Sequence, residues 1–239
     1  MSIGNLDPAF VLHKRPYRET SELVELFTLS LGRVGCVARG ANRRRRGGTL
    51  SQRLQLFRPI LVAVQGRSEL RTLAQVEDVS LAHYLSGDGF YAASYVNELL
   101  LRVLPMEDAY PEVFAAYAEL LPYFSYADEW PWRLCRFEWM LIEALGGAFD
   151  LLLDSESGDQ VKVDGHYALK PDQGWVALHG QGDDAAVNGR WIRQFSEGSP
   201  AIWGSREAKE LCRSLLRNFV GNKPFRSRIL WKQSRLGGQ

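Results

Sequence analysis

The sequence predicts an α+β fold in which a small β-barrel or β-sandwich precedes a mainly α-helical region with a β-hairpin insert. Short apolar segments broken by turn residues fill the first third of the chain, a pattern typical of barrels and sandwiches. From about residue 80 the apolar residues recur with the helical period, and residues 150–200 combine turn signals with two short apolar runs. A chain of 239 residues is long enough for two domains, which we expect at residues 1–80 and 81–239.

Five segments of the first third are predicted strands. Residues 60–65 are apolar, lie between Pro59 and Gly66, and are too short for an independent helix. Residues 22–28 are ambiguous, because their apolar positions fit a helix and a strand about equally well. The five candidates are residues 9–13, 22–28, 33–39, 60–65 and 69–74.

Proline and glycine residues bound the predicted helices. These helices span residues 90–104, ended by Pro105; 112–121, ended by Pro122; and 132–145, ended by Gly146. Residues 150–200 are predicted to be irregular, with a small hairpin formed by residues 167–169 and 175–179. A last helix is expected between the N-cap Ser205 and Gly221.

Charge is strongly segregated along the chain, although the formal net charge is only +1. Residues 1–80 hold 13 Lys and Arg against 7 Asp and Glu, and residues 206–239 hold 9 against 2. The middle, residues 81–205, holds 7 against 19. Two basic ends and an acidic middle indicate that the ends face a polyanion.

The strongest basic feature is a run of four arginines between small residues, directly after the predicted strand 33–39. A guanidinium group fits phosphate oxygens, and glycine lets a loop bend toward a polyanion, so the run predicts nucleic-acid binding. A solvated loop or an address tag is the alternative. The predicted phosphate ligands of this region are Arg33, Arg39, Arg43, Arg44, Arg45, Arg46 and Arg53.

A second basic surface is predicted near the other end of the chain. The predicted last helix places cations along one face and apolar residues opposite, and the following segment interleaves cations with aromatic residues that can stack on single-stranded bases. An ordinary solvated helix is the alternative. The predicted ligands are Lys209, Arg213, Arg217, Lys223, Arg226 and Arg228.

Enzymatic, metal and membrane signals are weak. The sequence lacks Walker-type, His-Glu-x-x-His and Gly-x-Ser-x-Gly motifs, and its four histidines lack metal-ligand spacing. Cys36, Cys135 and Cys212 are odd in number and far apart in sequence, which favours small buried side chains over disulfides or zinc ligands. No membrane span or signal peptide is indicated, and we expect a cytoplasmic protein without a catalytic centre.

Several stretches resemble the bacterial RecO family of DNA repair proteins, in the order and at the spacing of that family. They are residues 9–21 (AFVLHKRPYRETS), 32–34 (GRV), 38–41 (ARGA), 95–104 (YVNELLLRVL), 136–138 (RFE) and 221–228 (GNKPFRSR). The resemblance implies an N-terminal OB-fold barrel, with residues 22–28 as a strand, followed by a helical domain.

The resemblance also implies a recombination mediator of the RecF pathway with no catalytic chemistry. Such proteins bind single- and double-stranded DNA at the nucleoid, anneal complementary strands, bind the acidic C-terminal tail of single-stranded DNA-binding protein, and act with RecR to help RecA load. It assigns Arg136 to tail binding, and we add Arg133, one turn earlier, because Cys135 stands where a relative has a basic residue. Many members hold zinc with four cysteines, which this chain lacks between Cys135 and Cys212, so we expect no zinc and no cofactor.

Two other functions stay open. A basic OB-fold barrel can bind RNA, since no residue here identifies a reader of the 2′-hydroxyl. The chain can also be a protein adaptor for which DNA contact is incidental. A nuclease is the least favoured of the alternatives.

Overall fold

The computed structural model of the chain describes residues 6–44, 48–68, 70–80, 85–170, 173–179 and 186–236. Arg45 and Arg46 lie outside the described residues, as does Glu69 of the predicted strand 69–74.

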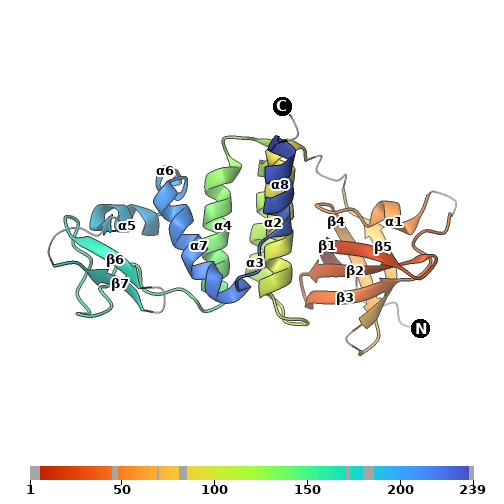
Figure 1. The fold of residues 1–239 in the computed structure, drawn as a ribbon. Helices are drawn as coiled ribbons and strands as arrows, with labels where there is room; N and C mark the ends of the chain where they lie inside the picture. Colours follow the sequence, from red (N-terminus) through yellow and green to blue (C-terminus); the bar gives the residue numbers. More distant parts are fainter. Residues whose placement is uncertain are drawn as a thin grey trace. The chain divides into compact units, whose positions relative to one another are not determined.

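The first strands form a closed barrel with the order β1-β2-β3-β5-β4 (Figure 1). β1 pairs with both β2 and β4, and a short parallel pairing of β3 with β5 completes the ring. The predicted barrel is confirmed, and residues 22–28 are a strand. The strands are β1 (Asp7–Tyr17), β2 (Ser21–Thr28), β3 (Gly32–Ala38), β4 (Pro59–Gln65) and β5 (Leu70–Asp78).

Small and branched apolar side chains fill the barrel. Val24 and Leu26 of β2 are buried, with the half-buried Glu25 between them, as expected for a strand with one face toward a core. Ala41, which precedes the segment of the four arginines 43–46 (the arginine loop), and Leu54, which follows the short helix α1 (Leu50–Arg53), belong to the same core. Helix α1 follows the loop.

Three helices pack with the barrel in one compact unit: α2 (Gly87–Val103), α3 (Pro111–Leu120) and α8 (Arg226–Leu236), with the 3-10 helix η1 (Leu121–Ser125) after α3. Asn97 of α2 donates to the Leu12 carbonyl of β1 at 3.1 Å and accepts from the Tyr117 hydroxyl at 2.6 Å. Phe10 of β1 packs edge-on against Tyr117, with ring centroids 5.0 Å apart. The predicted helices 90–104 and 112–121 are present.

Helix α8 is not expected from the sequence. The segment after Gly221 is predicted to carry cations and aromatic rings that stack on bases. Glu98 of α2 accepts hydrogen bonds from the backbone N–H groups of Arg226 and Ser227 and so caps α8. Phe225 packs against Tyr95 with centroids 4.8 Å apart. The tail is therefore ordered by tertiary contacts that a local pattern does not reveal.

The second unit contains α4 (Trp130–Ala144), β6 (His166–Lys170), β7 (Gly174–Ala177), β8 (Val187–Asn188), α5 (Gly189–Ser196), α6 (Pro200–Trp203) and α7 (Arg206–Val220). β6 and β7 form the predicted hairpin, to which β8 adds a third strand. Ser205 caps α7 through its side chain, and Gly221 ends it with φ +66°. Helices α5 and α6 correct the expectation of an irregular segment there.

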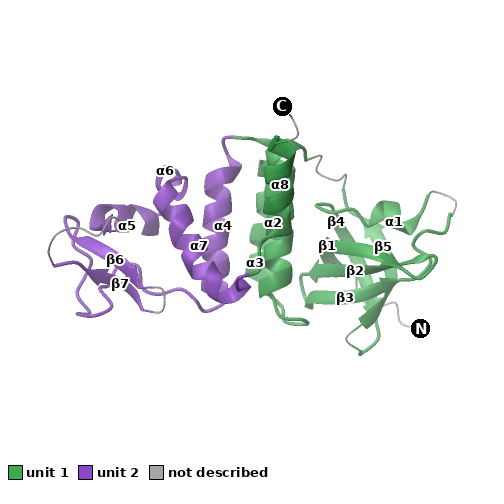
Figure 2. Cartoon of the chain, viewed as in Figure 1, with its two compact units in different colours: residues 1–127, 223–239 green, residues 128–222 purple. Residues whose placement is uncertain are grey.

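The two compact units are residues 1–127 with 223–239, and residues 128–222 (Figure 2). The expected boundary near residue 80 falls within unit 1, because α2, α3 and α8 group with the barrel. None of the described helices is both long enough and apolar enough to cross a membrane.

Candidate nucleic-acid interface

A groove of about 690 Å³ on the barrel brings four guanidinium groups together: those of Arg18, Arg39, Arg43 and Arg71. The turn between β1 and β2 forms one side, and the segment after β3 and the start of β5 form the rest. OB-folds bind oligonucleotides at the loops between strands 1 and 2 and between strands 4 and 5, and this groove includes the first of these loops and the start of β5. The other lining residues are Tyr17, Thr20, Ser21, Val37, Gly40, Leu70 and Thr72.

The cations of this groove differ in how freely they can meet a ligand. Arg39 and Arg43 are exposed, and within the described part of the chain no side-chain partner is assigned to either. Arg71 donates through Nε to Glu107 at 2.8 Å, and this hydrogen bond lowers the pKa of the Glu107 carboxyl. The Arg18 guanidinium lies 5.2 Å from the ring centroid of Tyr17. Among the described residues, the groove thus offers two unpaired cations, one paired cation and one cation beside an aromatic ring.

The base of the arginine loop is fixed by hydrogen bonds. The Asn42 N–H donates to the Thr20 carbonyl at 3.0 Å, and the Ser51 N–H donates to the Ala41 carbonyl at 3.0 Å. On the far side of the loop, the Ser51 hydroxyl donates to the buried Glu22 carboxylate at 2.7 Å. Arg43 follows Asn42 directly, so the Asn42–Thr20 hydrogen bond restrains the backbone that carries the Arg43 side chain.

Helix α1, after the loop, begins with a capping box, in which the Thr49 side chain and the Gln52 side chain each accept from the other's backbone N–H. Lys14 of β1 holds α1 by donating to the Ser51 carbonyl at 2.8 Å. Arg44 is exposed and does not line the groove.

Two arginines predicted as phosphate ligands have other partners. Arg33 donates to the Leu101 carbonyl and, through Nε, to the Met106 sulfur at 3.0 Å. Arg53 donates to Asp78 at 3.0 Å and to the Val76 carbonyl at 2.6 Å. Both guanidinium groups stabilise unit 1 itself, and we leave them out of the interface.

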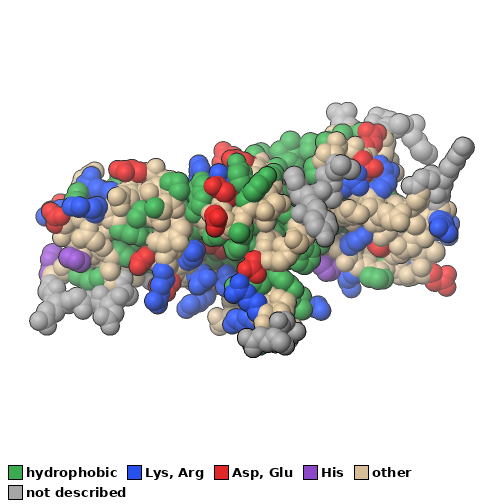
Figure 3. Space-filling view, turned by 90° about the horizontal axis from the view of Figure 1, so that it is seen from above, with side chains coloured by type: hydrophobic (Ala, Val, Ile, Leu, Met, Phe, Trp, Pro, Cys, Tyr) green, Lys and Arg blue, Asp and Glu red, His purple; other side chains and the backbone are tan. Residues whose placement is uncertain are grey.

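The basic face of α7 is present in unit 2. Arg213 and Arg217 are exposed and Lys209 is half-buried, whereas Leu211 and Leu215 are buried on the other side of the helix. Figure 3 shows Lys and Arg side chains at the surface of both units. The amphipathic pattern of the sequence therefore translates into an exposed cationic stripe.

The cations of the tail belong to unit 1, not to the unit that holds α7. Lys223 and Arg226 are exposed. Arg228 instead lies over the Tyr95 ring, with its guanidinium carbon 4.5 Å from the centroid. The Trp231 indole N–H donates to Asp88 at 2.7 Å, so this tail ring is engaged within unit 1.

The residues predicted to bind an acidic tail lie on α4. Arg136 is exposed, and Arg133 stands one turn earlier on the same helix. Arg133 pairs with Glu129 at 3.0 Å and lies 4.2 Å from the Trp132 ring centroid. Arg136 is thus the more accessible of the two cations.

Comparisons with known proteins agree with this architecture. Family models described as "Recombination protein O N terminal" and "Recombination protein O C terminal" match residues 1–82 and 85–193. The DNA repair protein RecO of Methylococcus capsulatus is 36% identical over 235 residues, covering 96% of this chain and 93% of the relative. The chain belongs to the RecO family.

Other RecO proteins match over similar lengths. The DNA repair protein RecO of Nitrosococcus oceani is 39% identical over 236 residues, covering 96% of this chain and 94% of the relative. The DNA repair protein RecO of Enterobacter sp. strain 638 is 40% identical over 227 residues, covering 94% of this chain and 95% of the relative. The resemblance found in the sequence is confirmed, as is the fold that it implied.

The four-cysteine zinc site that the RecO resemblance implies for many members does not fit this chain, which has no cysteine between Cys135 and Cys212. Aromatic rings from α4, α5 and α6 pack together in this unit. Phe195 of α5 lies 5.2 Å from Trp139 of α4 and 3.9 Å from Trp203 of α6, measured between ring centroids. All three rings are buried, so this part of unit 2 has an aromatic core.

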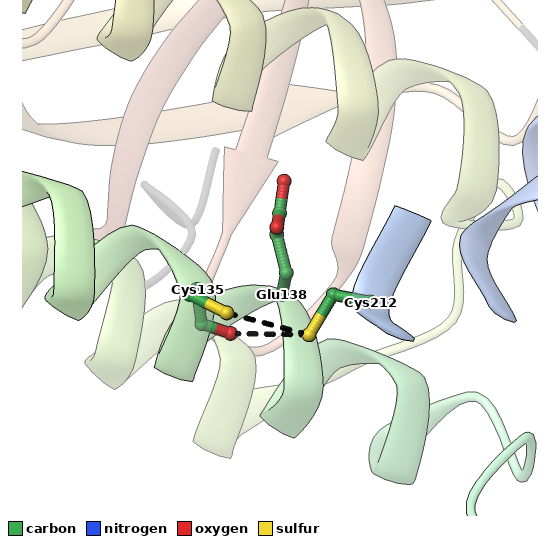
Figure 4. A group of neighbouring side chains, drawn as sticks. All are labelled: Cys135, Glu138 and Cys212. Atoms are coloured by element: carbon green, nitrogen blue, oxygen red, sulfur yellow. Dashed lines mark hydrogen bonds between the residues drawn. The ribbon is translucent and has the colours of Figure 1, made fainter. Parts of the chain in front are cut away.

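Cys135 and Cys212, the two cysteines of unit 2, meet between α4 and α7, although 77 positions separate them (Figure 4). Their sulfurs are 3.6 Å apart, and with Glu138 they are a group whose ligand atoms all lie within 4.8 Å of one another. The hydrogen bond with Cys135 and burial raise the pKa of the Cys212 thiol. Burial, aided by Glu25, raises the pKa of the Cys36 thiol to about 12, so neither thiol is an activated nucleophile.

Sequence reasoning missed Tyr17, Arg18 and Arg71 as groove residues. A signal was present for the first two, because Tyr17 ends the first strand and Arg18 begins the turn to the second, where OB-folds bind their ligands. Arg71 carries no comparable local signal. Only the pairing of β3 with β5 brings it beside Arg39 and Arg43.

Proposed function

We propose that this RecO family member is a recombination mediator in DNA repair. It binds single- and double-stranded DNA, anneals complementary strands, binds the C-terminal tail of single-stranded DNA-binding protein, and acts with RecR to promote loading of RecA. The observation that carries the proposal is the groove with four arginines on an OB-fold barrel of a RecO chain. We assign the protein no catalytic step and no catalytic cofactor, and we place it in the cytoplasm at the nucleoid.

The DNA contacts proposed for unit 1 are made by Arg39 and Arg43, with Arg18, Arg71 and the adjacent Arg44. Guanidinium groups at phosphates release counterions and read little base sequence. Binding of this kind suits annealing, because any two complementary strands must be accepted. Tyr17 in the same groove supplies a ring on which a base can stack.

A second DNA contact is proposed on α7, through Lys209, Arg213 and Arg217. A protein that holds one strand at each of two sites raises the effective concentration of one strand near the other. The exposed Lys223 and Arg226 add cations in unit 1. Reversing the charge of Arg213 and Arg217 should weaken annealing more than single-strand binding, whereas unchanged annealing would remove the two-site hypothesis.

The acidic tail of single-stranded DNA-binding protein is proposed to bind at Arg136, with Arg133 beside it. Arg136 is exposed, and a guanidinium group can hold a carboxylate through two hydrogen bonds. Contact with this tail would bring the mediator to DNA that is already coated.

The experiment that tests the proposal is annealing of complementary oligonucleotides coated with single-stranded DNA-binding protein, over a salt series. The coat is used intact and without its acidic tail. Tail-dependent, salt-sensitive annealing is expected, and Arg136→Ala should remove the tail dependence alone. The variant Arg39→Ala/Arg43→Ala should weaken binding of single strands and lower the slope of log affinity against log salt by about 0.7 for each phosphate that is no longer neutralised. Arg190→Ala, an exposed arginine of unit 2, is the matched control.

The same experiment separates the competing functions. Equal or better binding of RNA in competition with DNA would favour an RNA-binding factor. Annealing that survives loss of both groove arginines would favour a protein adaptor. Absence of annealing with either coat would contradict the mediator function itself.

A further inference from the structure

The Cys135 and Cys212 side chains meet between α4 and α7 with Glu138 next to them, and none of the three has a role in the function proposed above. Cys135 and Glu138 are three positions apart on α4 and therefore share a face of that helix, while Cys212 projects from α7 (Figure 4). All three side chains are buried, with relative exposures of 1%, 5% and 0%. Among the residues that the structure describes, they are the only group of His, Cys, Asp and Glu side chains with metal-ligand proximity.

The spacing of the two sulfurs matches that of two thiolates on one tetrahedral ion. A zinc–sulfur bond of about 2.3 Å and a tetrahedral angle put two bound sulfurs roughly 3.8 Å apart. The sulfurs of Cys135 and Cys212 are 3.6 Å apart, and an oxygen of Glu138 lies within 4.8 Å of both. In a tetrahedral site an oxygen bound at about 2.0–2.2 Å lies roughly 3.5 Å from each sulfur, so the Glu138 carboxylate must move toward the two sulfurs and exchange its present interaction for the ion.

Contrary to the absence of zinc expected from the sequence, we propose that Cys135, Cys212 and Glu138 bind one zinc-class divalent cation in unit 2. Two soft sulfurs select Zn²⁺ over the hard cations Mg²⁺ and Ca²⁺, which prefer all-oxygen sites. The ion replaces the two thiol protons: Zn²⁺ with two Cys–SH and one Glu carboxylate gives the bis-thiolate carboxylate complex, with net charge −1, and two protons. The fourth ligand would be a water molecule or the Cys135 carbonyl oxygen, which now accepts a hydrogen bond from the Cys212 thiol at 3.7 Å.

This site is distinct from the four-cysteine zinc site of other RecO proteins. Its sulfurs come from the two helices on either side of the insert, not from within it. A bound ion would join α4, which carries Arg133 and Arg136, to α7, which carries the basic stripe. The metal would therefore fix the two helices that present the exposed cations of unit 2, whether or not those cations bind DNA.

The test uses the reduced, metal-free full chain titrated anaerobically with Co²⁺, which reports on its ligands spectroscopically. One ion per chain, with thiolate-to-cobalt charge transfer in the near ultraviolet and the visible bands of tetrahedral Co²⁺, is expected, and Zn²⁺ should displace it. Cys135→Ser/Cys212→Ser should abolish these bands. Cys36→Ser, which removes the buried thiol of the barrel, should leave them unchanged. Glu138→Gln should keep both sulfurs and lower the affinity at least about tenfold, since even the loss of an outer-shell partner of a ligand costs about 10–100-fold.

Three results of the cobalt titration would overturn the proposal. They are absence of the bands in the reduced protein, their persistence in the double serine variant, and their loss in Cys36→Ser. If the double variant does not fold, X-ray absorption of the cobalt-loaded wild-type protein gives the number of sulfur ligands per ion. Two sulfur ligands per ion support the site, and fewer than two refute it. Formation of a Cys135–Cys212 disulfide in air by protein that binds no Co²⁺ when reduced would also refute it.

Discussion

Replacing Glu98 by alanine should release α8 from α2. The Glu98 carboxylate accepts from the backbone N–H groups of Arg226 at 2.9 Å and Ser227 at 3.0 Å, and from the Ser227 hydroxyl at 2.9 Å. Arg102 adds an ion pair at 2.6 Å. The first N–H groups of a helix have no partner within it, so one side chain of α2 supplies the N-terminal cap of α8.

The expected cost follows from these bonds. A hydrogen bond to a charged group contributes about 1.5–3 kcal/mol, and loss of an N-cap costs about 1 kcal/mol. Arg226 is exposed, so its freed N–H regains water, whereas Ser227 is buried; the sum therefore overestimates the effect mainly through the Arg226 bond. We expect Glu98→Ala to lower the free energy of unfolding by about 2–4 kcal/mol, and Glu98→Gln, which keeps one carbonyl acceptor, by about 1–2 kcal/mol.

Equilibrium urea unfolding measures this cost, and hydrogen exchange at the Ser227 amide reports whether α8 is released. Glu119→Gln, an exposed glutamate of α3, is the control and should change stability by less than about 0.5 kcal/mol. A decrease in stability below about 0.5 kcal/mol for Glu98→Ala, or unchanged exchange at Ser227, would refute the capping role.

The same interaction should depend on pH. Burial raises the pKa of Glu98, but hydrogen bonds from Ser227, Arg226 and Arg102 outweigh it and hold the pKa below its ordinary value of 4.5. A lowered carboxyl pKa gives stability that is present above the unfolded-state value and is lost as the pH falls toward the folded-state value. The difference in stability between wild type and Glu98→Gln should therefore be constant above pH 4.5 and shrink below it. A constant difference down to strongly acidic pH would contradict this account.

Two further predictions concern unit 1. Gly32→Ala should lower the free energy of unfolding in urea by more than about 2 kcal/mol, because Gly32 has φ +68° and a Cβ there would lie 1.8 Å from the Asp108 carbonyl oxygen. Gly87→Ala is the control for backbone strain alone, since Gly87 has φ +54° and no atom near the added Cβ. Equal decreases in stability for the two variants would exclude a contribution from the clash. Tyr117→Phe should lower the free energy of unfolding by about 1–3 kcal/mol, because it removes the hydroxyl that donates to the buried Asn97 amide oxygen at 2.6 Å. A free energy of unfolding within about 0.5 kcal/mol of the wild-type value, measured by heat or urea, would show that this bond contributes nothing.

The barrel and the main helices could be predicted from sequence because their signals are local. Pro59 and Gly66 bound a short apolar strand, and Ser205 and Gly221 mark the ends of α7. Helix α5 was missed because Asn188-Gly189 is typical of a turn. Here Asn188 is an N-cap that accepts from the Arg190 N–H at 2.8 Å, and a Cβ on Gly189 would lie 2.0 Å from the Lys162 carbonyl oxygen.

The candidate site was less predictable, because it depends on which charges are paired. Charge counting cannot distinguish Arg39, which is exposed, from Arg33, which donates to a helix carbonyl 68 positions away. In the same way, Cys135 and Cys212 look unrelated in the sequence and touch only because α4 packs against α7. Tertiary pairing over such separations leaves no periodic trace in the chain.

The division of unit 1 into two chain segments has a consequence for biosynthesis. Between the end of the first segment at Ala127 and the start of the second at Lys223, the ribosome must add the 95 residues of unit 2. At roughly 5–20 residues per second this takes about 5–20 s, much longer than a small domain needs to collapse. During that interval α2 presents Glu98 and Tyr95 without α8, and unit 2 can fold before unit 1 is complete.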